Sequence, residues 1–267
     1  MAIDPISLSI LFLAGTIIAC LGAMSGLGGG FLCVPFLLLV WNLGREEAVL
    51  ISLTMILANS ISSSFSYIRS KMVDFMVAGM LAVTAVPALY LGYILLKSMD
   101  EHVFDLIFAI LLISVTTYII LKRSRKKDPD DKSGSNKDGE SERVLIPYIS
   151  MPLSFLSGLA SSAFGIGGGA ILMPLQVGLL KMDVKRAIAT SMFLIMILSG
   201  FRVIVISGAS FDPAIALPLA AGALIGAQIG AMIVKRLKGQ VLLYILASFL
   251  FLIGVYMGGG ALIGLLT

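Results

Sequence analysis

The sequence Gly26-Leu-Gly-Gly-Gly-Phe-Leu-Cys-Val-Pro35 returns as Gly165-Ile-Gly-Gly-Gly-Ala-Ile-Leu-Met-Pro174, at an offset of 139 residues. Each stretch interrupts strongly apolar sequence with three consecutive glycines, and each places a proline five residues after the last glycine. The same offset also aligns Ala48, Ser52, Ile56 and Ser60 with Ala187, Ser191, Ile195 and Ser199. We therefore predict an internal duplication, with a first repeat at 1–121, a linker at 122–143 and a second repeat at 144–267.

The composition excludes an ordinary soluble domain. Of 267 residues, 58% are hydrophobic and 13% are charged, whereas soluble domains carry about 25% charged residues. The linker alone holds eight of the 19 basic residues and six of the 15 acidic ones. Apart from Arg202, the remaining basic residues lie at the ends of apolar segments, which is typical of membrane proteins rather than of nucleic-acid binders. The N-terminus has no basic region of the kind that begins a signal peptide, so we expect 6–24 to be a retained span.

Ten apolar segments follow from this pattern, and they predict an all-α polytopic membrane protein. Eight are long enough to cross a hydrocarbon core of about 30 Å, which needs about 20 residues. Two are too short to do so, and each of these directly follows a glycine cluster. The long segments are 6–24, 48–68, 75–96, 103–121, 144–164, 187–206, 213–234 and 240–258, and the short ones are 31–41 and 170–180.

The distribution of basic residues predicts the orientation. If the chain reverses at every break, the linker shares one side with Arg69, Lys71, Lys185 and Lys235, whereas the other side receives mostly acidic loops. The positive-inside rule then makes the linker cytoplasmic in a multi-pass plasma-membrane protein. Five segments in each half is an odd number, so the two repeats are expected to be inverted relative to each other.

The glycine clusters have two interpretations. In an inverted pair the two breaks meet near the midplane, and short helices beginning near Phe31 and Ala170 would point unpaired N–H groups and positive dipole ends at one anion. Alternatively, the glycines only let helices pack closely, and this packing role is the one expected for Gly92, Gly222, Gly226 and Gly230.

The paired motifs resemble the twin signature of the TauE/SafE family of sulfite and organosulfonate exporters. The resemblance extends to Ala187-Ile-Ala-Thr190-Ser191, which is similar to a segment that follows each signature in that family. In the first half Ile51 stands where Thr190 stands in the second, and Phe164 replaces Ser25. The resemblance implies a transporter and, for several members, export of sulfur-containing anions.

The candidate substrate-binding residues combine the glycine breaks with neighbouring hydroxyls and one arginine. Hydroxyl donors suit a sulfonate or sulfite, although serines in spans also bond to their own helix. Arg202 lies inside 187–206, where it either relays an anion or extends to the nearby interface. The predicted set is Ser25, Gly28, Gly29, Gly30, Ser52, Gly167, Gly168, Gly169, Thr190, Ser191 and Arg202, with Pro35 and Pro174 as structural residues.

The sequence thus favours a secondary transporter of small anions working by alternating access, with an anion channel that uses the same turns as a static filter as the alternative. An intramembrane hydrolase is disfavoured, because Ser25 and the only histidine, His102, are predicted at opposite sides of the membrane. Cys20 and Cys33 show no metal-ligand spacing. We expect no cofactor, no metal and no nucleic acid, with a small anion and lipids as partners; a homo-oligomer is left open.

Overall fold

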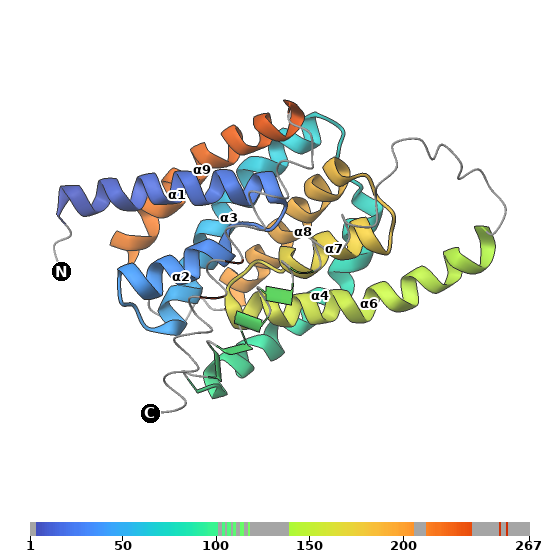
Figure 1. The fold of residues 1–267 in the computed structure, drawn as a ribbon, viewed down its shortest axis with the longest axis horizontal. Helices are drawn as coiled ribbons and strands as arrows, with labels where there is room; N and C mark the ends of the chain where they lie inside the picture. Colours follow the sequence, from blue (N-terminus) through green and yellow to red (C-terminus); the bar gives the residue numbers. More distant parts are fainter. Residues whose placement is uncertain are drawn as a thin grey trace.

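The computed structural model describes residues 4–100, 139–205 and 212–236, with isolated positions between 103 and 117 and at 251 and 255. Eight helices have defined bounds in these ranges, and no strand occurs in them (Figure 1). The helices are α1 (Pro5–Ser25), α2 (Gly30–Val40), α3 (Arg45–Arg69), α4 (Phe75–Ser98), α6 (Gly139–Phe164), α7 (Gly169–Gly178), α8 (Val184–Val205) and α9 (Pro213–Arg236).

Five of these helices, α1, α3, α4, α8 and α9, are long and apolar enough to cross a membrane. They correspond to the predicted segments 6–24, 48–68, 75–96, 187–206 and 213–234, and α2 and α7 correspond to the two short ones. Helix α6 begins at Gly139, five residues before the predicted start at 144. The predicted segments 103–121 and 240–258 fall largely outside the described residues, as do His102 and linker positions 122–138.

The short helices exist because the backbone turns sharply at the glycines. Helix α1 ends where Gly26 adopts a left-handed conformation, and α2 begins after Gly29, whose φ is 87°. Gly168 occupies the same place before α7, with a φ of 78°. Residues with a Cβ adopt this conformation at a cost of roughly 1–2 kcal/mol, whereas glycine does so freely. The glycine runs therefore stop one helix and start the next within a few residues.

Two pairs of parallel helices form the outer part of the described structure. Helix α1 packs along α9, and α4 packs along α6 (Figure 1). A side chain at Gly222 would collide with the carbonyl oxygen of Phe12, and one at Gly226 with that of Thr16. In the second pair, Gly92 meets the backbone of α6 at Leu159 in the same way. These contacts agree with the packing role expected for these glycines, which let helix backbones approach closely in membranes.

Helices α3 and α8 lie at the centre. About 72% of the apolar window of α3 and 61% of that of α8 are buried, against 33% for α1. The two helices contact each other, and the short helices α2 and α7 pack on them (Figure 1). The middle of the molecule is therefore built from two long buried helices and two short ones.

Charged side chains gather at the two ends of α3. In its first turn, Glu46 pairs with Lys97 at 3.6 Å, and Glu47 accepts a hydrogen bond from the backbone of Asp212 at 3.3 Å. In its last turn, Ser66 accepts a hydrogen bond from Lys235 at 3.1 Å. We call these the Glu46 end and the Lys235 end. Loops that the sequence assigned to opposite sides of a membrane thus lie at opposite ends of one helix.

Candidate functional site

The two glycine turns touch each other at the centre of the molecule. A Cβ at Gly30 would collide with the carbonyl oxygen of Gly165, and a Cβ at Gly169 would lie 2.6 Å from the carbonyl oxygen of Gly26. The contacts are reciprocal, because Gly30 and Gly169 are equivalent at the offset of 139, as are Gly26 and Gly165. The structure therefore brings together the two clusters that the sequence predicted to meet.

This contact also brings two helix N-termini together. Gly30 is the first residue of α2 and Gly169 the first of α7, and neither helix has a side-chain cap on its preceding glycine. The first N–H groups of a helix have no partner within the helix, and the aligned peptide dipoles give that end a partial positive charge. Two such ends beside one another create a positive potential without any cationic side chain.

One face of α3 holds the glycine turns in place. Ser52 donates a hydrogen bond from its Oγ to the carbonyl oxygen of Gly165 at 2.9 Å. Two turns further along, Asn59 donates from Nδ2 to the carbonyl oxygen of Gly28 at 2.8 Å. Ile56 lies between them and contacts the Gly28 and Gly167 positions. Each of the two turns therefore receives a polar partner from α3.

The matching face of α8 carries an isoleucine and a serine at equivalent positions, but its serine differs in hydrogen bonding. Ile188 lies against Gly26, and Ile195 lies against Gly28 and Gly167. Ser191 lies between these two isoleucines on the same helical face, as expected for a spacing of three and four residues. Its hydroxyl is fully buried and has no hydrogen-bond partner among the described residues. Ser52 and Ser191, which the repeat pairs, thus differ in one hydrogen bond.

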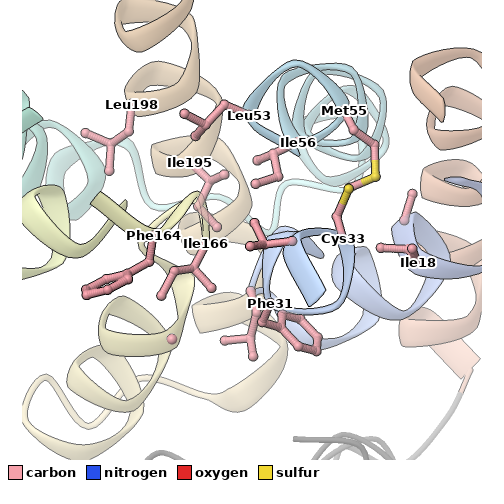
Figure 2. Close-up of a cluster of buried hydrophobic side chains, with 14 of the residues drawn as sticks. Ile18, Phe31, Cys33, Leu53, Met55, Ile56, Phe164, Ile166, Ile195 and Leu198 are labelled. Atoms are coloured by element: carbon pink, nitrogen blue, oxygen red, sulfur yellow. The ribbon is translucent and has the colours of Figure 1, made fainter. Parts of the chain in front are cut away.

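The surroundings of the turns are apolar. Figure 2 shows Ile56 of α3, Ile195 of α8 and Ile166 of the second glycine turn converging on one another. All three side chains are fully buried. A dry environment of this kind strengthens every hydrogen bond and dipole inside it, and it makes an unpaired polar group costly.

Two predicted site residues have partners other than the opposite glycine turn. Ser25 donates to the carbonyl oxygen of Gly22 at 3.1 Å and accepts from the backbone of Leu27 at 3.4 Å, so it closes its own turn. Thr190 accepts a hydrogen bond from the backbone of Asp74 at 3.0 Å and ties α8 to the start of α4. Ser25 thus donates within its own turn, and Thr190 is engaged as an acceptor by the start of α4.

Several other serines and threonines bond only to their own helix, which is the alternative that the sequence left open. Thr54, Ser60 and Ser63 each donate to a carbonyl oxygen three or four residues earlier.

Pro35 is buried inside α2, and Pro174 lies within α7. The structural role of the two prolines stays a prediction.

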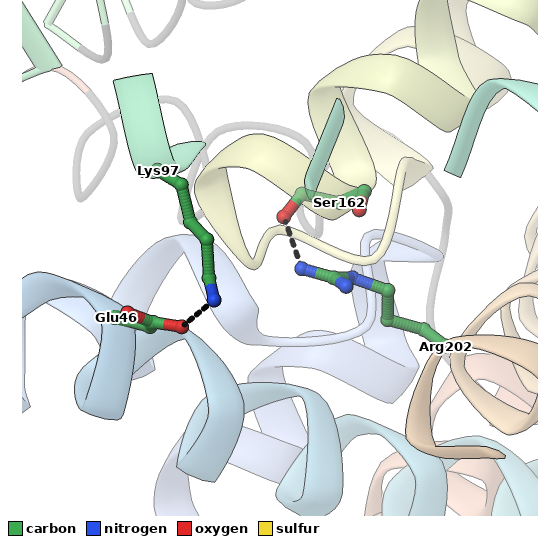
Figure 3. Close-up of polar contacts among 4 residues, drawn as sticks. All are labelled: Glu46, Lys97, Ser162 and Arg202. Atoms are coloured by element: carbon green, nitrogen blue, oxygen red, sulfur yellow. Dashed lines mark hydrogen bonds and ion pairs between the residues drawn. The ribbon is translucent and has the colours of Figure 1, made fainter. Parts of the chain in front are cut away.

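Arg202 is fully buried in α8. Its Nη2 donates to the carbonyl oxygen of Ser162 at 3.1 Å (Figure 3). Its Cζ lies 4.6 Å from the centre of the Tyr93 ring. An arginine that extended to the interface would expose its guanidinium group, so this geometry favours an interior role. Ser162 precedes Gly165 by less than one helical turn, which places Arg202 beside the second glycine break.

Sequence reasoning missed three residues that hold the breaks. Asn59 is absent from the predicted set, although its spacing of seven from Ser52 places both side chains on one face of a helix. Tyr67 donates to the carbonyl oxygen of Ala23 at 2.8 Å, and Ser157 donates to that of Gly168 at 2.8 Å. No spacing in the sequence indicates these two, because the contacts depend on how the chain folds back on itself.

Comparison with known proteins gives a consistent result. Residues 11–257 match the family described as "Sulfite exporter TauE/SafE". The chain is 29% identical to the "Probable membrane transporter protein YunE" of Bacillus subtilis, covering 93% of this chain and 96% of that protein. It is also 30% identical to the "Probable membrane transporter protein MJ0441" of Methanocaldococcus jannaschii, over 69% of this chain and 66% of that protein. No solved structure matches the chain. With its apolar helices and its paired glycine breaks, the chain is an integral membrane protein that belongs to the TauE/SafE family of membrane transporters.

Proposed function

We propose that this protein is a secondary transporter of small anions, with sulfite or an organosulfonate as the substrate. The anion binds between the two glycine breaks near the membrane midplane and reaches each side in turn by alternating access. The observation that carries this proposal is the convergence of the α2 and α7 N-termini at Gly30 and Gly169. Paired discontinuous helices are the usual substrate site of secondary transporters.

We further propose that the two halves are inverted repeats. Support comes from the offset of 139, which relates the start of α2 to that of α7 and the start of α3 to that of α8. Helix α2 leads toward the Glu46 end, whereas α7 leads to Lys185, which donates to the backbone of Lys235 at the other end. The two short helices thus return to opposite ends, as an inverted arrangement requires.

The chemistry of the breaks favours an oxyanion. Backbone N–H groups at helix N-termini bind anions without any cationic side chain. The buried hydroxyl of Ser191 adds a donor that no described protein group uses. The several oxygens of a sulfite or sulfonate accept several such bonds at once, which a halide does less well because it offers one spherical surface.

Alternating access agrees with the unequal bonding of Ser52 and Ser191. In this structure Ser52 holds the carbonyl oxygen of Gly165, whereas the equivalent bond from Ser191 to the carbonyl oxygen of Gly26 is not made. In the proposed cycle the opposite state makes the Ser191 bond and releases Ser52. An inverted pair of halves provides two such states, because the halves can exchange conformations so that the site opens to the other side of the membrane.

The test is uptake of radiolabelled anions into liposomes that hold the purified protein, with protein-free liposomes as the control. We expect saturable uptake of sulfite or of an alkyl sulfonate, and faster uptake when the liposomes are preloaded with the unlabelled anion. A channel would instead give flux that does not saturate and follows the membrane voltage. No uptake of any anion in a panel of sulfite, sulfonates, sulfate and carboxylates would overturn the proposed substrate class.

A further inference from the structure

Arg202 carries hydrogen-bond donors that no described group uses. Its guanidinium group has five N–H donors, and one nitrogen, Nη2, bonds to the carbonyl oxygen of Ser162. Nε and Nη1 are buried and have no partner among the described residues. Leaving such donors unpaired away from water is costly, more so on a charged group. The side chain is therefore held ready for an acceptor that is not part of its described surroundings.

No described carboxylate forms a close ion pair with Arg202, and Glu46 acts on its charge only at longer range. Glu46 is drawn in the same close-up, but its Oε1 pairs with Lys97 at 3.6 Å (Figure 3). The described neighbour of the guanidinium is the face of Tyr93, which is shared, because Lys97 Nζ also lies 4.7 Å from the centre of that ring. Two cationic side chains thus lie close to one aromatic ring.

Capping of α6 alone does not explain a charged residue here. The carbonyl oxygen of Ser162 lies three residues before Gly165, and that of Ala23 lies three residues before Gly26. In the first half the neutral hydroxyl of Tyr67 bonds to the Ala23 carbonyl at 2.8 Å. A neutral donor therefore suffices to hold the equivalent helix end. The positive charge and the spare donors at Arg202 call for a second role.

We propose that Arg202, Tyr93 and Lys97 form a binding site for a small oxyanion on the Glu46 side of the second glycine break. Arg202 supplies Nε and Nη1 as donors, and Lys97, which is 52% exposed and pairs with Glu46 in this structure, supplies an ammonium group closer to the surface that an anion would share with Glu46. Planar guanidinium groups suit anions that present two or more oxygens, such as sulfonate or sulfite. The site lies about one helical turn from Gly165, so it would hold the anion just before or after the central site. This proposal rests on the proposed function and adds a second anion-binding site to the same transport path.

The test uses binding in detergent, which does not depend on transport. The thermal midpoint of the purified protein is followed while sodium sulfite or sodium methanesulfonate is added, with sodium chloride as the ionic-strength control. We expect Arg202→Gln to keep a donor for the Ser162 carbonyl but to raise the half-saturating anion concentration at least about tenfold, because bonds to a charged donor are lost. Arg186→Met, which removes a charge from the other end of α8, is the matched control and should bind as the unmodified protein does.

Wild-type affinity in a folded Arg202→Gln protein would overturn the site. If that variant does not fold, Lys97→Met decides, since Lys97 is half-exposed: an unchanged half-saturating concentration would overturn the cluster, and a rise of about two- to fivefold would support it. Failure of the proposed function gives a different result. In that case the anion still binds in a way that depends on Arg202, but the protein takes up no anion into liposomes. Uptake that persists with unchanged anion binding in Arg202→Gln would leave the transporter standing and remove this site.

Discussion

At the scale of single residues, the pair formed by Ser52 and Ser191 shows how two equivalent positions come to differ. Both hydroxyls lie on the buried face of a central helix, and both are one helical turn from an isoleucine that contacts the glycine turns. Ser52 has a carbonyl partner, whereas Ser191 has none among the described residues. The two serines are therefore expected to respond differently to the same substitution.

We expect Ser191→Ala to weaken anion uptake without weakening the fold. Removing a buried hydroxyl that has no protein partner costs no hydrogen bond, so the thermal midpoint should stay the same or rise slightly. The Michaelis constant for the transported anion should rise about 2- to 10-fold, the value of one lost hydrogen bond. The measurement is the concentration dependence of uptake into liposomes.

Ser199→Ala is the matched control on the same helix, because Ser199 bonds to the carbonyl oxygen of Ile195 within α8. Uptake by this variant should match that of the unmodified protein. If both variants leave the Michaelis constant unchanged, Ser191 does not contact the anion.

Asn59 gives a second prediction at this scale. Replacing it with leucine, the residue at the equivalent position 198, should leave the carbonyl oxygen of Gly28 buried without its partner. Such a loss costs about 1–3 kcal/mol, so the thermal midpoint should fall clearly. Ser60→Ala, which removes only a bond within α3, should change it little. Equal midpoints for the two variants would show that the Asn59 bond does not stabilise the break.

At the scale of helices, close backbone packing of α1 on α9 limits which residues can stand at the contact. A side chain at Gly226 would collide with the carbonyl oxygen of Thr16, which belongs to the backbone and cannot move aside. Gly226→Val should therefore destabilise the protein by more than about 3 kcal/mol, as expected for a severe steric clash. The yield of monodisperse protein in gel filtration, together with its thermal midpoint, measures this.

Gly79→Val is the control for that substitution. Gly79 lies in α4, and a Cβ added there would have no neighbouring atom within 4 Å, so valine fits without a clash. We expect normal yield and an unchanged or higher midpoint, because glycine is a poor helix former. A similar loss of yield for both variants would mean that the defect comes from valine in a helix rather than from packing.

The helices themselves were largely predictable, whereas their partners were not. Runs of about 20 apolar residues predicted α1, α3, α4, α8 and α9, and the glycine clusters predicted where α2 and α7 begin. The side chains that donate hydrogen bonds to the glycine breaks were harder to predict from the sequence. Tyr67 and Ser157 reach carbonyl oxygens at the breaks only after the helices have packed, and nothing in a local pattern records that contact. Thr190 shows the opposite case, because a motif residue bonds to the start of α4 rather than to the break.

At the scale of the whole molecule, the segregation of charge predicts two separately accessible surfaces. Ser98 lies at the Glu46 end beside Lys97, and Lys71 follows α3 at the Lys235 end. In a protein with Cys20 and Cys33 replaced by alanine, Ser98→Cys and Lys71→Cys should react with a membrane-impermeant maleimide from opposite sides. Labelling of both cysteines from the same side of intact cells or oriented vesicles would contradict a transmembrane path for α3 and α4.

The contact between the glycine turns also bears on how the two halves can change over generations. The space beside Gly30 is filled by the Gly165 carbonyl, and the space beside Gly169 by the backbone of Leu27 and Gly26. A mutation that enlarges either glycine is therefore felt first by the other half of the chain, and a compensating change would have to arise there. The two halves can therefore differ in sequence on their outer faces. Where the glycine turns touch, the residues of each half restrict which substitutions the other half can accept.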